Sequence, residues 1–359
     1  MRANGRDAQL STQFFCSLAH RADAYASPVL LGHARTIIAE LHHQRRLGFA
    51  IVLLLLEGKA NGAVLSLCMA CRVRQPFQGD AVGYILPANT PRFADPFFSE
   101  FIAGLGDETA LHPFDLVISI APPGEEPEKH LYQNWVQGRK VDGFILTHLH
   151  LYDWRVQYLS QQGVPFAALE NSLDGFNFAR VEVNRQGGMV ELVTHLVERG
   201  FRRIAYLGGA PELKIQADQF KGHRQGLEIT DIPYDPNLLT AGDLTSSGGY
   251  LATKHMLSIP DPPNAIACIN DETAFGVLHA AHELGLQIGR DLAVAGFDGV
   301  QASRYTEPPL TTLDIPVYDI ARQLVKMLVT DIVGHTLPDR RVVLQPKLLI
   351  RESTSGNFS

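Results

Sequence analysis

From residue 81 onward, short apolar runs alternate with stretches whose apolar residues recur at helical spacing. The repeat of about 30 residues is typical of βαβ units in a doubly wound parallel sheet. The alternation predicts strands over 82–86, 114–120, 141–147, 164–169, 203–209, 265–269 and 292–295. It predicts helices over 96–105, 126–138, 154–162, 187–199, 215–227, 248–257, 271–284 and 317–333.

The alternation runs in two series, and a stiff segment rich in proline (308–316) separates the second series from the last elements. We therefore expect an α/β fold with two doubly wound parallel-sheet lobes. The last elements of the chain are expected to return to the first lobe and to make further crossings between the lobes. The first lobe is expected over 81–172 plus about 313–345, and the second over 173–312 plus about 346–355. Several crossings between lobes act as a hinge, and the cleft between them is a natural small-molecule site.

Polar side chains follow the predicted strands at the edge where ligands of parallel sheets bind. Asn270 and Asp271 follow one strand, Asp298 ends the next, and Glu170 follows the strand over 164–169. Carboxylates and carboxamides suit vicinal hydroxyl groups, so we expect these four to converge on a small, hydroxyl-rich molecule. The alternatives are that Asn270 or Asp271 only caps the following helix, and that Glu170 is a solvated loop charge.

Composition favours a globular protein without a membrane anchor. The hydrophobic fraction is 45% and the net charge is −7. Residues 1–80 carry nine Lys/Arg against five Asp/Glu, whereas residues 81–359 carry 22 against 33. A basic N-terminal segment followed by an acidic remainder is typical of a protein whose N-terminal segment contacts DNA. Chance explains the excess of four basic residues equally well. The apolar run over 49–56 is too short to span a bilayer, and no export signal is recognisable, so we expect a cytoplasmic location.

The N-terminal segment, residues 1–80, lacks the strand–helix alternation, and its fold is uncertain, irregular or partly helical. A basic amphipathic helix over 33–46 is the one element that its pattern suggests.

We expect neither catalysis nor a bound cofactor or metal. No dinucleotide fingerprint, Walker motif or nucleophile elbow occurs. Cys68 and Cys71 have metal-ligand spacing but lack a second pair, so the four cysteines, Cys16 and Cys268 included, are expected to be reduced thiols. His148 and His150 follow a strand and should point the same way in an extended chain. A metal site there is the alternative to cleft lining or surface exposure.

The part of the chain from Ala81 onward resembles the effector-binding core of the LacI/GalR family of bacterial transcription regulators. The resemblance rests on fragments that occur in the family's order: AVGYILP (81–87), DPFF (95–98), VDGFIL (141–146), NRQGG (184–188), RIAYLGG (203–209), ND (270–271), VAGFD (294–298), PLTT (309–312) and IREST (350–354). It implies a periplasmic-binding-protein-like type I fold, a sugar, sugar phosphate, nucleoside or purine as effector, and a homodimer that binds operator DNA. Phe98 resembles the position that packs against the ligand ring, with an apolar core role as the alternative.

The sequence departs from the family at two places. The family's helix-turn-helix headpiece is not recognisable in residues 1–80, so DNA binding by this chain is in doubt, and a reading-frame artefact upstream of about Gly79 is one explanation. Gln219 occupies a position where the family usually has arginine, and Val183 one where aspartate is common. An amide carries no charge, unlike a guanidinium, so Gln219 as a site residue predicts a neutral effector.

Taken together, the sequence predicts a ligand-responsive transcriptional regulator that binds a neutral sugar or oligosaccharide between its lobes. The alternative is a transport-linked periplasmic sugar-binding protein of the same fold. A third reading is an α/β enzyme on this scaffold, because fold alone does not decide function.

Overall fold

The computed structural model describes residues 80–86, 95–121, 124–172 and 175–356. Contacts group residues 79–359 into one unit. The predictions for residues 1–79, including the basic helix over 33–46, lie outside the described residues, as do Cys16, Cys68 and Cys71. Cys268 is buried and free. None of the helices that the structure describes is long and apolar enough to cross a membrane.

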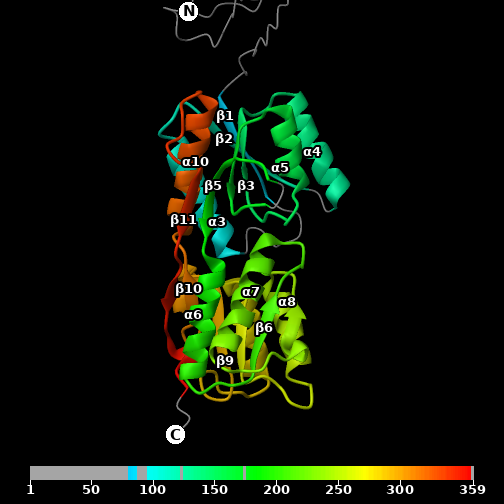
Figure 1. Ribbon diagram of the computed structural model, residues 1–359, viewed down its shortest axis with the longest axis vertical. Helices are drawn as coiled ribbons and strands as arrows, with labels where there is room; N and C mark the ends of the chain where they lie inside the picture. Colours follow the sequence, from blue (N-terminus) through cyan, green and yellow to red (C-terminus); the bar gives the residue numbers. More distant parts are fainter. Residues whose placement is uncertain (1–79, 87–94, 122–123, 173–174, 357–359) are drawn as a thin grey trace, which may run out of the picture. The chain divides into compact units, whose positions relative to one another are not determined.

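The first sheet has the strand order β11-β5-β4-β3-β1-β2, and all neighbours are parallel. Its strands are β1 (Ala81–Leu86), β2 (Asp115–Ile120), β3 (Gly143–Leu146), β4 (Phe166–Leu169), β5 (Ala179–Val183) and β11 (Arg341–Leu344). Its helices are α3 (Pro96–Thr109), α4 (Glu125–Gln137), α5 (Trp154–Gln162) and α10 (Val317–Ile332). Helices α3 and α10 lie side by side, and α4 and α5 contribute to a separate apolar cluster (Figure 1).

The second sheet repeats this arrangement with the order β12-β10-β9-β8-β6-β7, in which only the β10–β12 pair is antiparallel. Its strands are β6 (Ile204–Gly208), β7 (Leu239–Ala241), β8 (Ala265–Cys268), β9 (Ala293–Asp298), β10 (Thr311–Asp314) and β12 (Lys347–Leu349). Its helices are α6 (Arg185–Glu198), α7 (Lys214–Ile229), α8 (Ser246–Met256) and α9 (Asp271–Glu283). Three short 3-10 turns complete the described elements: η1 (Pro236–Leu238), η2 (Gln301–Arg304) and η3 (Glu352–Thr354).

Two parallel-dominated sheets with flanking helices confirm the expected fold class for the described part of the chain. Strands such as β1, β3, β4, β8 and β9 are buried along their whole length, as parallel strands covered on both faces should be. The chain passes between the sheets after β5, after β10 and between β11 and β12 (Figure 1).

The sheet pairing moves the expected lobe limits by several residues. Strand β5 pairs with β4 in the first sheet, so the first crossing follows Val183 rather than residue 172. Strand β10 pairs with β9 in the second sheet, so the return follows Asp314. No strand was predicted at β5, although Arg180 and Glu182 alternate with its apolar residues as they do in a half-buried strand. The apolar-rich run over 342–350 is divided at Pro346 between β11 and β12, which lie in different sheets.

Polar side chains at the sheet edges cap the starts of several helices, α3 and α9 among them. Asp95 accepts a hydrogen bond from the backbone N–H of Phe97 (2.9 Å), and Pro96 occupies the first helical turn, where no N–H is needed. Asn270 caps α9 in the same way, through the backbone N–H of Thr273 (3.0 Å). Both caps also bring a carboxyl or amide group to the edge where the cleft forms.

Close packing of α8 on α9 depends on Gly276, and we expect Gly276→Ala to destabilise the fold by about 1–3 kcal/mol. A Cβ at Gly276 would lie 1.9 Å from the carbonyl oxygen of Ser246 and 2.6 Å from the backbone nitrogen of Tyr250. Gly106→Ala in α3 is the matched control, because its nearest neighbour would lie 4.0 Å away. Alanine there should raise stability by up to about 1 kcal/mol. Thermal or urea unfolding of both variants tests this, and equal effects would contradict it.

Candidate functional site

A pocket lies between the two lobes at the carboxyl ends of their strands. It encloses about 430 Å³ of space free of protein atoms, its open mouth included. Its lining comes from both lobes: Asp95, Phe97, His148, Leu169 and Glu170 from the first, and Arg185, Ile215, Leu244, Ile269, Asn270 and Asp298 from the second. A site at this edge of two parallel sheets agrees with the general position of ligands in such folds.

Asp298 is the last residue of β9 and presents its carboxyl group to the pocket. It is 8% exposed, and its φ of 102° is a backbone conformation that L residues rarely adopt. No described residue donates a hydrogen bond to its carboxyl oxygens; the nearest cation is the Nη1 of Arg185, at 3.9 Å from Oδ1. Burial raises the pKa of Asp298 well above its usual range. A buried carboxyl group without a donor is suited to receive one from a ligand.

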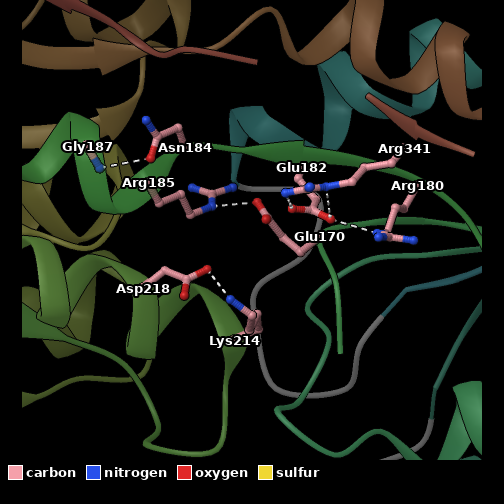
Figure 2. Close-up of polar contacts among 9 residues, drawn as sticks. All are labelled: Glu170, Arg180, Glu182, Asn184, Arg185, Gly187, Lys214, Asp218 and Arg341. Atoms are coloured by element: carbon pink, nitrogen blue, oxygen red, sulfur yellow. Dashed lines mark hydrogen bonds and ion pairs between the residues drawn. The ribbon is translucent and has the colours of Figure 1, made fainter. Parts of the chain in front are cut away.

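Glu170 and Arg185 form a buried ion pair that joins the two lobes at the pocket floor (Figure 2). The Nε of Arg185 donates to Oε1 of Glu170 at 2.7 Å, and both side chains are less than 5% exposed. The guanidinium also lies 4.9 Å from the centre of the Phe297 ring. Burial raises the pKa of Glu170, and the adjacent Arg185 opposes that shift. Glu170 is therefore not a solvated loop charge.

Asn270 lines the pocket and caps α9 at the same time. Its Oδ1 accepts from the Thr273 N–H, and its Nδ2 donates to the carbonyl of Leu244 at 3.2 Å. The capping alternative is therefore correct for its main contact. An amide group has further donor and acceptor capacity beyond these two bonds.

Asp271 is fully buried and does not line the pocket. Its Oδ1 accepts from the Thr312 hydroxyl at 2.6 Å, and its Oδ2 accepts from the Val300 N–H at 2.9 Å. Burial raises its pKa to about 8. These contacts join the start of α9 to β10 and to the segment after β9. The contacts of Asp271 are therefore structural.

Gln219 and Phe98 also lie outside the pocket lining. Gln219 is completely buried in the second lobe, where its Oε1 accepts from the Tyr206 hydroxyl at 3.3 Å and its Nε2 donates to the carbonyl of Ile269 at 3.0 Å. Phe98 is fully buried and stacks on His148, with ring centres 5.4 Å apart. Its neighbour Phe97 is the aromatic residue that lines the pocket.

Asp95, His148 and Arg185 line the pocket but were not among the predicted site residues. Burial raises the pKa of Asp95 to about 6. Burial lowers the pKa of His148 to about 3, so its ring is neutral. A signal for Arg185 was present in the sequence, because it belongs to the fragment NRQGG and opens α6 at the same sheet edge as the carboxylates.

The segment that carries His148 and His150 does not favour a metal. His148 has a φ of 52°, so the chain is not extended there and the two rings are not bound to point the same way. Among the described residues, no group of three or more His, Cys, Asp or Glu side chains is arranged to hold a metal ion.

The same segment makes backbone hydrogen bonds to the second lobe beside the pocket. Leu151 N–H donates to Glu212 at 2.8 Å, and Lys214 N–H donates to Leu149 at 2.9 Å. Together with a β-bridge between His150 and Leu213, these bonds join residues 149–151 to residues 212–214. We call this contact the clasp.

Comparisons with known proteins agree with this fold. Residues 193–354 match the periplasmic binding protein-like domain family. The chain is 28% identical to the HTH-type transcriptional regulator CelR of Thermobifida fusca over 277 residues, which are 76% of this chain and 81% of CelR.

Two solved structures give the same result. A regulatory protein of the LacI family from Chloroflexus aggregans is 29% identical with a TM-score of 0.67, and the match covers 77% of this chain and 98% of that one. A structure of the transcriptional regulator CelR in complex with cellobiose is 25% identical with a TM-score of 0.71, and the match covers 94% of each chain. From Ala81 onward the chain is therefore similar, in sequence and in fold, to the effector-binding core of LacI-family regulators.

Proposed function

We propose that this protein is a ligand-responsive transcriptional regulator whose effector is a neutral, sugar-like molecule bound between the lobes. The observation that carries the proposal is the interlobe pocket, whose lining includes the carboxyl group of Asp298, the capping amide of Asn270 and the Glu170–Arg185 pair. The relatives are transcriptional regulators rather than enzymes, and one solved structure is of a CelR–cellobiose complex. A pocket with three carboxyl groups and one guanidinium disfavours an anionic ligand.

The site residues in this proposal differ from the six predicted from the sequence. Asp298, Asn270 and Glu170 are retained, and Asp95, Phe97 and Arg185 are added because they line the pocket. Phe98, Gln219 and Asp271 are assigned supporting roles, since their contacts lie inside the lobes. The lobes in this proposal are bounded by the chain crossings after Val183 and Asp314 and between β11 and β12.

The effector would act by its different affinity for two arrangements of the lobes. The three chain crossings at the hinge allow the lobes to rotate, and a ligand that contacts both lobes favours the closed arrangement. For coupling to transcription we propose a homodimer. Exposed apolar side chains on and near the edge strand β2, namely Leu111, Ile118 and Ile120, and Leu251 on α8 supply candidate contacts. The proposed partner is operator DNA in the cytoplasm, and its binding depends on residues 1–80.

The proposal is tested by thermal-shift and calorimetric measurements with cellobiose, ribose and other neutral sugars. A ligand at 100 times its Kd should stabilise the protein by about 2.7 kcal/mol. Recovery of the bound sugar unchanged would support sensing, whereas its conversion would point to an enzyme. Absence of binding to any neutral sugar, or recovery of the protein from the periplasm, would contradict the proposal.

A further inference from the structure

The interlobe pocket contains a guanidinium whose charge is already matched by a carboxylate. Among the described residues, only Glu170 accepts a hydrogen bond from the side chain of Arg185. An arginine has five N–H donors, so most of its donor capacity remains for a ligand. Arg185 is 4% exposed and lines the pocket, and Asp298 lies at 3.9 Å, beyond hydrogen-bond distance. The guanidinium is thus held in place while its positive charge is balanced.

Among the residues that the structure describes, the other charged groups near this pair do not supply a second unpaired cation. Lys214 lies close by, but it is paired with Asp218 on the next turn of α7 (Figure 2). Asp95 and Asp298 add two further carboxyl groups to the pocket lining. Gln219 lies inside the second lobe and does not line the pocket. The lack of an arginine at position 219 therefore does not explain a neutral ligand. The pairing of Arg185 with Glu170 is the remaining feature of the pocket's one guanidinium that bears on ligand charge.

We propose that Glu170 is a specificity-determining residue, which masks the charge of Arg185 so that the pocket accepts neutral polyols and rejects sugar acids and other anions. The inference rests on the proposed function, since it concerns the effector pocket of that function. Glu170 accepts the hydrogen bond from the Nε of Arg185. The N–H groups on the two Nη atoms of the guanidinium then remain available to donate to uncharged hydroxyl groups. With Glu170 neutralised, the same donors would face the pocket with an unbalanced positive charge and attract a carboxylate bidentately.

The test measures calorimetric binding of glucuronate to wild-type protein and to Glu170→Gln. We expect the wild type to bind glucuronate weakly or not at all, and Glu170→Gln to bind it at least about tenfold more tightly, because one buried charge next to the ligand has been removed. The double variant Glu170→Gln/Arg185→Gln should lose this gain. Cellobiose binding by the wild type, measured in parallel, tests the proposed function separately, so either idea can fail without the other.

Glu182→Gln is the matched control. Glu182 also pairs with arginines, Arg180 and Arg341, but it does not line the pocket (Figure 2). Its replacement changes the net charge by the same amount and should leave glucuronate binding unchanged. A folded Glu170→Gln protein without a gain, or an equal gain in Glu182→Gln, would overturn the proposal. If Glu170→Gln does not fold, Glu170→Asp withdraws the carboxylate from Arg185, and a folded Glu170→Asp protein without any gain would overturn it equally.

Discussion

Asp298→Ala is expected to weaken binding of the neutral sugar by about 1–3 kcal/mol, which is roughly 5- to 150-fold in Kd. The carboxyl group is buried, lines the pocket, and receives no hydrogen bond from any described residue. A sugar hydroxyl group that donates to it would satisfy an acceptor that the protein alone leaves open. Alanine removes that acceptor and leaves the hydroxyl group without its partner in a dry site.

Calorimetry of the wild type and the variant gives the change in Kd directly. Asp261→Ala is the control, because the Asp261 side chain is 75% exposed and pairs with Arg203 away from the pocket. Asp298→Gly separates binding from strain, since glycine adopts the φ of 102° without cost while also lacking the carboxyl group. Both Asp298 variants should lose affinity alike, and unchanged binding in either would remove Asp298 from the site.

Asp271→Ala should lower the free energy of unfolding by roughly 2–4 kcal/mol without any direct effect on a ligand. The substitution leaves the buried N–H of Val300 without its acceptor and removes the partner of the Thr312 hydroxyl. Asp271→Asn keeps the shape, and with its oxygen toward Val300 and its amide nitrogen toward Thr312 it should retain most of the stability. Urea unfolding of the three proteins measures the difference, and an alanine variant as stable as the asparagine variant would contradict the assignment.

The same residue predicts a pH dependence of stability. Burial raises the pKa of Asp271 from 3.8 to about 8 in the folded protein. Between these values the folded protein holds a proton that the unfolded chain has released, so this group makes stability fall as the pH rises from about 4 to 8. The Asp271→Asn protein lacks the titration. Its melting temperature should therefore fall less than that of the wild type between pH 5 and pH 8, and parallel curves would count against the shift.

The sequence pattern predicted most of the fold because parallel strands and their helices carry strong apolar periodicity. The helix over 154–162 and the start of α10 at Val317 coincide with the prediction. Strands β5, β7 and β10 were not predicted: each is short, and the sheet to which β5 belongs depends on a pairing that no local pattern reveals. The division of 342–350 between two sheets has the same origin, since the pairing partners lie far away in the sequence.

The candidate site was less predictable than the fold. Asp298, Asn270 and Glu170, which were predicted as effector-binding residues from the ends of strands, line the pocket, because their place depends only on where a strand stops. Whether a side chain at such an end turns toward the pocket or the lobe interior depends on its rotamer and neighbours. Asp271 faces inward for this reason, and Phe98 and Gln219, which lie on helices α3 and α7, also face inward. The partnership of Glu170 with Arg185 joins two elements whose contact only the folded chain reveals.

The clasp has a consequence for how opening can be observed. Its two hydrogen bonds join main-chain groups of separate lobes, so the amide protons of Leu151 and Lys214 lose their acceptors whenever the lobes swing apart. Deuterium uptake at these two amides would count the molecules that have opened, while amides inside the strands stay protected until global unfolding. Exchange at these two amides therefore reports lobe opening without an attached probe, and it can be measured before the ligand is identified.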